Sequence, residues 1–299
     1  MRTTQATFDP VVLRSDPQAL MAAWAGLLQK HEHLHQPQAA AMLDVPEACL
    51  VAAQLGKAAT RLEGDPAEIL SAISGFGKLL IAVPHHAGVL IGIARPVRFS
   101  LDGKRFVLTD GFTTLSVAAD SIDQMYTVIE HDGMHGRERH LQVFDAHGDG
   151  LFKLLVLYKR NEADLIRLSE KYRAKEQPTI LNLTPKSRIQ VTDMQVERSH
   201  SEATVVTLDA MSQILKNHCA SGGVLALESR QSSVTLSVEA DAPKMYGVED
   251  NMLHMSHALM KFHSHGRRLG ALEVQHEGFV CRSGSSELWF RTISRKGIE

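Results

Sequence analysis

The amino-acid sequence predicts an α+β protein built as two tandem units, each an antiparallel sheet flanked by helices, that arose by internal duplication. Residues 141–156 and 259–274 share seven identities in 16 ungapped positions. Upstream, residues 114–117 and 235–238 both read Thr-Leu-Ser-Val. Within each half, the spacing of apolar residues also changes from one typical of helices to one typical of strands. Two copies of about a hundred residues or more indicate a duplicated domain and not a solenoid.

The first part of the chain is predicted to be helical, with helices at residues 16–28, 38–43, 47–53 and 65–75. Asp16 followed by Pro17 is typical of a capped helix start with proline at its first position. A second Asp-Pro pair begins at Asp65, and Gly75 follows the last apolar residues of that helix. These helices are expected to cover the sheet that follows.

The period then changes to that of β-strands, which are expected at residues 79–83, 89–93, 105–108, 114–118, 125–130, 140–145 and 151–158. Short strands joined by turns that contain glycine and aspartate are typical of an antiparallel meander. Residues 145–149 predict a hairpin turn, with Gly148 at a left-handed position. Asn161 is expected to cap a closing helix that carries Leu165 and Tyr172.

Domain boundaries follow from a polar segment that contains Pro178 and Pro185. We predict a helical entry plus a first repeat over residues 1–175, a linker over residues 176–202, and a shorter, divergent second repeat over residues 203–299. The second repeat is expected to begin with a helix at residues 209–217 and to continue as strands from Val224.

Composition excludes several classes of protein. A hydrophobic content of 44% and a charged content of 22% are ordinary for a globular protein. The formal net charge of -2 argues against nucleic acid as a partner. Three cysteines without paired spacing fit a reducing compartment. Without a run of ~20 apolar residues, we expect no membrane insertion and a cytoplasmic location. The 16 histidines are unusual, and imidazole is the commonest metal-ligating side chain.

Two segments resemble the haem-utilisation proteins of the HemS/ChuX family. Residues 39–53, AAAMLDVPEACLVAA, are similar to that family's helical entry. Residues 141–156, LQVFDAHGDGLFKLLV, resemble its hairpin of the type QFFDxxGDALLKV. The resemblance covers about residues 38–173 well and the second half weakly. Longer members of the family are similar in having two tandem copies.

The resemblance implies a cytoplasmic haem-binding protein of haem uptake or utilisation, acting either as a haem carrier or in haem processing. Haem would be its cofactor or cargo. A membrane haem importer or other haem-handling proteins would be partners, and a homodimer is left open. A haem-degrading activity is equally compatible with the resemblance. The alternative is a structural or regulatory relative that kept the fold and lost haem ligation.

The resemblance also implies an iron ligand. Residues 84–89 match the family pattern VHTADV at three positions, which makes His85 the metal ligand and His86 its neighbouring substitute. The competing interpretation is a solvated strand end. A second family histidine falls near Ser116 or Val117, neither of which is histidine, so His254 or His257 from the histidine-rich second half would replace it.

Arg95 and Arg98 are candidates for contact with the carboxylates of a cofactor. Three positions apart, they would point to opposite faces of a regular strand. Pro96 lies between them and can bend the chain, so both could reach one cleft rim. There a guanidinium would hold a carboxylate bidentately. The competing interpretation is a pair of ordinary surface arginines at a strand end.

Overall fold

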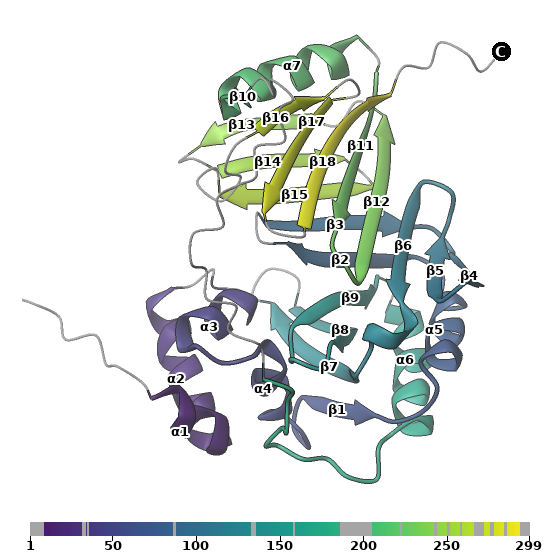
Figure 1. Ribbon diagram of the computed structural model, residues 1–299. Helices are drawn as coiled ribbons and strands as arrows, with labels where there is room; N and C mark the ends of the chain where they lie inside the picture. The colour runs from purple at the N-terminus through teal and green to yellow at the C-terminus, as the bar shows by residue number, and fades with distance from the viewer. Residues whose placement is uncertain are drawn as a thin grey trace, which may run out of the picture. The chain divides into compact units, whose positions relative to one another are not determined.

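The computed structural model divides into two compact units, which are interleaved along the chain (Figure 1). Unit 1 comprises Met1–Ile69 and Ser121–Lys186, and unit 2 comprises Leu70–Asp120 and Ser187–Glu299. The structure describes residues 9–31, 34, 36–85, 88–132, 136–157, 159–185, 205–221, 223–241, 244–249, 252–257, 259–265, 272–275, 278–283 and 286–293. The boundaries predicted above follow chain order and stay a prediction about the sequence repeats. The compact units do not follow chain order, because strands of residues 70–120 pair with strands of the second half.

Unit 1 contains an antiparallel sheet in the order β1-β7-β8-β9, formed by β1 (Ala59–Leu62), β7 (Gln124–Asp132), β8 (Gly136–Phe144) and β9 (Gly150–Val156). Its helices are α1 (Pro10–Ser15), α2 (Pro17–Lys30), α3 (Gln36–Leu43), α4 (Glu47–Ala52) and α6 (Lys159–Lys171). The predicted helix start is confirmed, since the Asp16 carboxylate accepts the backbone N–H groups of Gln18 and Ala19.

Each face of the unit 1 sheet is covered by helices. On one face, Tyr126 and Phe144 meet edge to face, with ring centroids 5.7 Å apart, and pack in one cluster with Ala48 and Val51 of α4. The other face meets α6, where the Thr127 and Ser169 hydroxyls are 2.6 Å apart. Alternate residues of β7 therefore face different helices: one set faces α4 and the other faces α6.

Unit 2 contains two antiparallel sheets. The first has the order β2-β3-β15-β14-β13, formed by β2 (Leu79–His85), β3 (Gly88–Ala94), β15 (Met260–His265), β14 (Met252–His257) and β13 (Lys244–Glu249). The second has the order β10-β16-β17-β18-β11-β12-β6-β5-β4, formed by β10 (Val205–Val206), β16 (Leu272–Gln275), β17 (Gly278–Ser283), β18 (Ser286–Ile293), β11 (Val224–Arg230), β12 (Val234–Asp241), β6 (Thr113–Ala118), β5 (Arg105–Thr109) and β4 (Arg98–Asp102).

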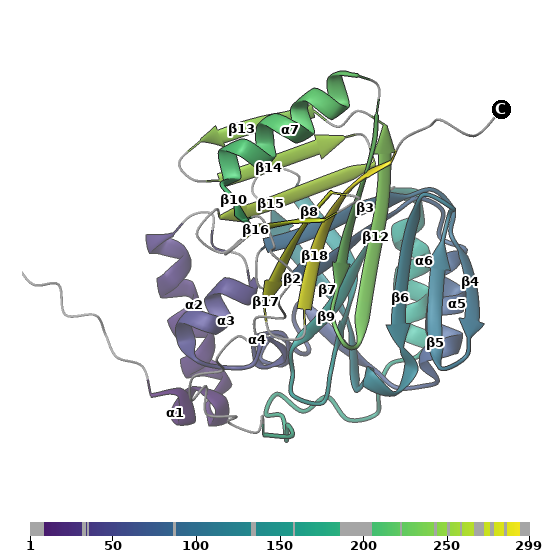
Figure 2. The same ribbon diagram turned by 45° about the horizontal axis from the view of Figure 1, so that its top comes forward.

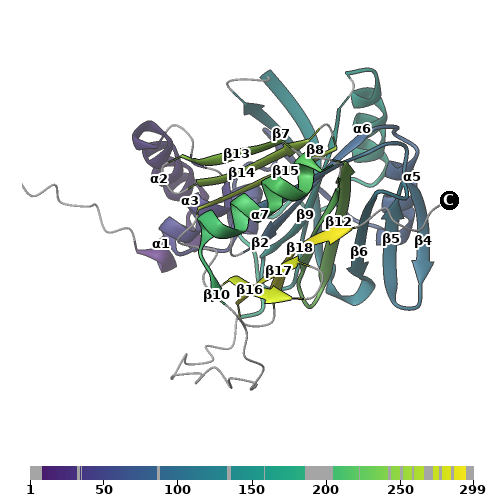
Figure 3. The ribbon, with the colours of Figure 1, turned by 90° about the horizontal axis from the view of Figure 1, so that it is seen from above.

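The strands of these two sheets cross at a steep angle, as Figures 1 and 2 show. The helix α7 (Leu208–Ala220) packs against β13 and β11 (Figure 3). Two further elements, α5 (Pro66–Ser74) and a 3-10 turn (Ala119–Ser121), lie where the chain passes from one unit to the other. The predicted α+β class with antiparallel sheets is confirmed.

The two sheets of unit 2 approach closely at Gly92. A Cβ atom at this position would lie 2.7 Å from Thr113 Cγ2 and 2.8 Å from Val238 Cγ2. Both neighbours are β-branched and therefore stiff at χ1. The contact explains why glycine occupies the middle of a buried strand.

Gly92→Ala is therefore expected to destabilise the protein by about 1–3 kcal/mol through overpacking. Equilibrium denaturant unfolding measures the change. Gly26→Ala is the control, because a Cβ there meets nothing within 4 Å and the residue lies inside α2. That control should be neutral or stabilising. Equal effects of the two substitutions would contradict the packing described here.

The internal duplication is visible in the order of elements. Among the described residues, a strand, a helix and eight further strands run from β1 through α5 to β9, and again from β10 through α7 to β18. The pairings correspond, since β1-β7-β8-β9 matches β10-β16-β17-β18. The pairing of β3 with β15 likewise matches that of β12 with β6.

The register of the repeat predicted from sequence is wrong. Residues 141–156 form the hairpin β8–β9, whereas residues 259–274 contribute to β15 and β16, which lie in different sheets. By element order, β8 and β9 correspond to β17 and β18. Strands with alternating apolar residues and glycine turns resemble one another at many offsets, because their period is only two residues. The sequence identities therefore matched strands that are not equivalent in the two repeats.

In the described parts of the chain, no helix is long and apolar enough to cross a membrane.

Candidate functional site

His85 ends β2 on the side of the strand that faces the core of unit 2. Burial alternates along β2, and the side chains of Ile81, Val83 and His85 are all buried, with His85 9% exposed. The side-chain amide of Gln231, in the turn after β11, donates to the carbonyl of Pro84 and anchors this strand end. The interior between two packed sheets is ~10 Å thick and filled by side chains. A large planar ligand at His85 would have to enter from the strand end.

The histidines of β14 occupy positions apart from His85. His254 pairs with His263 of β15, which pairs with Val89 of β3. Val89 pairs with Pro84, the neighbour of His85, so strand alternation assigns the position of His254 to the opposite face of the sheet. His257 is at a same-face position, but its pairing leads to Gly92, four residues or about 13 Å along β3 from the partner of His85. His86 falls in a gap between the described ranges.

Arg95 and Arg98 lie at the far end of β3 from His85. His85 pairs with Gly88, and seven residues separate Gly88 from Arg95, or about 23 Å along the strand. The backbone N–H of Arg95 donates to Asp110 Oδ2 at 2.8 Å, and both arginines are exposed. The predicted residues that the structure describes thus lie at separate points of unit 2, and it does not gather them into one site.

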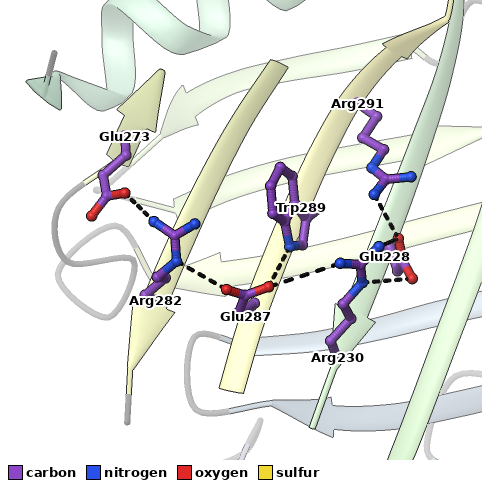
Figure 4. Close-up of polar contacts among 7 residues, drawn as sticks. All are labelled: Glu228, Arg230, Glu273, Arg282, Glu287, Trp289 and Arg291. Atoms are coloured by element: carbon purple, nitrogen blue, oxygen red, sulfur yellow. Dashed lines mark hydrogen bonds and ion pairs between the residues drawn. The ribbon is translucent and has the colours of Figure 1, made fainter. Parts of the chain in front are cut away.

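A cluster of aromatic and charged side chains occupies the second sheet of unit 2 on the face away from the core (Figure 4). Along β18, Leu288 and Phe290 are buried, so Trp289 points to the other side. Three guanidinium groups surround the indole, with ring-centroid distances of 5.3 Å, 5.9 Å and 5.3 Å for Arg230, Arg282 and Arg291. We call this group, with the three glutamates that pair with it, the Trp289 cluster: Glu228, Arg230, Glu273, Arg282, Glu287, Trp289 and Arg291.

Glu287 is the central acceptor of the Trp289 cluster. Its carboxylate accepts a hydrogen bond from Trp289 Nε1 at 2.7 Å and one from Arg282 Nε at 2.9 Å. Burial alone would raise the pKa of Glu287, but these hydrogen bonds and the nearby guanidinium charges lower the pKa below its usual value. Glu287 is therefore ionised at neutral pH.

The remaining contacts extend the cluster over β16, β17, β18 and β11. Arg230 Nε lies 2.8 Å from Glu228 Oε1, and Arg291 lies 3.7 Å from the other oxygen of that carboxylate. Arg282 also pairs with Glu273. Three arginines thus face three glutamates, and the formal charges of the cluster balance.

The chemistry of the Trp289 cluster suits a planar ligand that carries carboxylates. The three arginine side chains are 32% to 40% exposed, so a ligand can reach them. An indole offers a large flat contact area, and guanidinium groups bind carboxylates bidentately. Each glutamate already holds the position that a ligand carboxylate would take. Binding would exchange one carboxylate partner for another, and the displaced glutamate would have to turn to solvent.

The sequence did not reveal this cluster because its members come from four strands, and β11 is distant along the chain from the consecutive strands β16, β17 and β18. The available signal was alternation: Glu287, Trp289 and Arg291 occupy every second position of β18, between apolar residues. When a tryptophan and the charged residues on both sides of it share one strand face, that face is expected to be accessible to solvent and not part of the core.

Comparison with known proteins gives a family match and a fold. Residues 44–172 match the family described as the haemin-degrading HemS.ChuX domain, which confirms the predicted resemblance. The fold is similar to that of PhuS, a heme-binding protein from Pseudomonas aeruginosa, with a TM-score of 0.76, 19% identity and coverage of 94% of both chains. It is also similar to that of ChuS, a heme-degrading enzyme of Escherichia coli, with a TM-score of 0.74, 16% identity and coverage of 95% of this chain and 96% of that one. No curated protein matches the sequence.

Proposed function

We propose that this chain, which carries a HemS/ChuX domain match over residues 44–172 and has the fold of PhuS and ChuS, binds haem for its uptake or utilisation. The observation that carries the proposal is the agreement of a domain match with a fold that spans nearly the whole of a haem-binding protein. The domain match lies mainly in the first half of the chain, while the fold comparison extends to both halves.

The Trp289 cluster is the part of the structure whose donors best fit haem. The macrocycle is flat and apolar and carries two propionates, which correspond to the indole and the guanidinium groups of Arg230 and Arg282. Bound haem would supply an iron centre, and the protein would supply binding and orientation. The Trp289 cluster would hold the propionate edge and would keep its arginines charged throughout.

Iron ligation remains the proposal that the resemblance implies, with His85 as the ligand, and His86, His254 and His257 as substitutes. His85 faces the core side of unit 2, whereas Trp289 faces away from the core of its own sheet. One haem cannot contact both side chains as they stand. Substituting His85 and Trp289 one at a time therefore shows at which of these two positions haem binds.

Trp289→Ala is expected to weaken ferric haem binding about tenfold by removing the stacking surface. Absorbance titration in the Soret region measures the affinity. Phe112→Ala is the matched control, because Phe112 is a half-exposed aromatic side chain in the same unit outside the cluster. A loss of affinity in His85→Ala with a shifted Soret band, and no change in Trp289→Ala, would instead place haem at the end of β2.

Carriage and processing of haem are distinguished by adding a reductant such as ascorbate to the haem complex under air. A carrier keeps its Soret absorbance, whereas a haem-degrading enzyme loses it as the macrocycle opens. A cytoplasmic location, contact with a haem importer and a homodimer belong to the same proposal. The alternative, a structural or regulatory relative without haem ligation, predicts no spectral change on titration.

A further inference from the structure

A pocket of about 290 Å³ opens in unit 1 on the sheet face that carries α6. The helix packs against β8 and β9, and the β1–β7 side of the same face is left as the pocket floor. Thr60 and Thr127 pair across β1 and β7, and Ile129 pairs with Arg139 of β8, so strand alternation brings these residues to one face. The whole lining comes from unit 1.

Most of the charged side chains in the pocket lining are cationic. Its charged side chains are Lys57, Arg139, Arg173 and Glu170. Three cations and one carboxylate give the lining a formal charge of +2, and Glu162, which pairs with Arg139 from outside the lining, reduces this to +1. A concave surface of one sign favours ligands of the opposite sign.

Arg139 is the most enclosed of these cations. Its side chain is 18% exposed, and its buried Nε has no hydrogen-bond partner among the described residues. The nearest carboxylate oxygen, Glu162 Oε2, lies 3.5 Å from Nε in an ion pair without hydrogen-bond geometry. Since Nε itself is buried, a bound oxyanion would meet the part of the Arg139 side chain that lines the pocket and would accept a charge-assisted hydrogen bond there.

Neutral donors lie beside the guanidinium. The Thr127 and Ser169 hydroxyls are 2.6 Å apart, and one of them keeps capacity for a further hydrogen bond. Leu165 and Ile166 of α6 supply an apolar wall. Cationic, hydroxyl and apolar groups thus meet in one small cavity.

We propose that this pocket binds a small organic oxyanion, either a carboxylate or a phosphate ester, with Arg139 as its main anchor. Its volume is at the lower limit of ligand pockets, which suits a small metabolite and excludes a tetrapyrrole macrocycle. The pocket shares no residue with the Trp289 cluster, so the proposal is independent of haem binding.

Titration of the full chain with citrate and with inorganic phosphate, followed by two-dimensional NMR, tests the proposal. Saturable shifts of the Ser169 and Thr127 amide signals are expected for at least one probe, and the preferred probe distinguishes the two sources of the oxyanion. Arg139→Gln should weaken the binding at least tenfold, because a charged hydrogen bond is lost. Arg167→Gln is the control for loss of a positive charge, since Arg167 lies on α6, is 70% exposed and does not line the pocket.

Lys57→Ala provides a second variant that keeps the protein folded, because Lys57 is exposed. It should weaken the binding by a smaller factor and reduce its dependence on salt. Absence of saturable shifts with both probes would overturn the proposal. Equal weakening by Arg139→Gln and Arg167→Gln would overturn it as well, because the anion would then respond only to net charge.

Discussion

Gly278→Ala is expected to destabilise the protein by about 3–5 kcal/mol. A Cβ atom at Gly278 would lie 1.9 Å from the carbonyl oxygen of Phe290, a backbone atom that cannot rotate away. The φ angle of Gly278 is 142°, which L side chains rarely adopt. The β17–β18 pairing would have to separate, since Gly278 pairs with Arg291 and Phe279 with Phe290.

Urea unfolding of the parent and of Gly278→Ala measures this effect. Gly103→Ala is the control, because Gly103 also has a positive φ, 57°, but an added Cβ meets nothing within 4 Å. The control isolates the backbone strain, about 1 kcal/mol. Similar losses in both variants would show that the close approach to Phe290 contributes nothing. Since β17 also carries Arg282, haem affinity should fall together with stability in Gly278→Ala.

Acidification is expected to destabilise the protein through His140. The side chain is fully buried in β8, and burial together with the charge of Lys153 lowers the pKa of His140 to about 4. An unfolded histidine has a pKa of 6.5. Between these two values the unfolded chain binds a proton that the folded chain excludes. The stabilising contribution is thus complete above pH 6.5 and is lost as the pH falls toward 4.

The expected loss at pH 5 is about 2 kcal/mol relative to pH 7.5, as the linkage relation gives for these two pKa values. Glu47 acts in the opposite direction, because burial raises the pKa of its carboxyl group. The matched variant His140→Gln removes the histidine term and leaves Glu47 in place. Unfolding of both proteins at the two pH values gives the difference, and an equal pH dependence in parent and variant would contradict the assigned pKa.

The fold class and most elements could be predicted from the sequence because their signals are local. The capping pair Asp16-Pro17 and the alternating run that begins at Leu79 each depend on residues a few positions apart. Two strands were not predicted because their sequence patterns are weak. The strand β1 (Ala59–Leu62) has only four residues, and β4 (Arg98–Asp102) is a largely exposed edge strand. Neither has a periodic pattern long enough to stand out.

The candidate site was predicted less well, because it depends on which strands become neighbours. His85 was correctly placed near the end of a strand, but its burial on the core side depends on packing between two sheets. The members of the Trp289 cluster lie on β11, β16, β17 and β18, and only the pairing of these strands brings them together. Spacing along the chain carries no such information.

Absorbance titration of the purified parent protein with ferric haem decides whether this chain binds haem. We expect a Soret band shifted from that of free haem, saturation at one haem per chain, and a dissociation constant of about 1 μM or lower. Affinity should weaken as the pH falls through the histidine range if imidazole ligates the iron. A spectrum that stays identical to that of free haem at every ratio would contradict haem binding and would favour a relative that has kept the fold without the ligand.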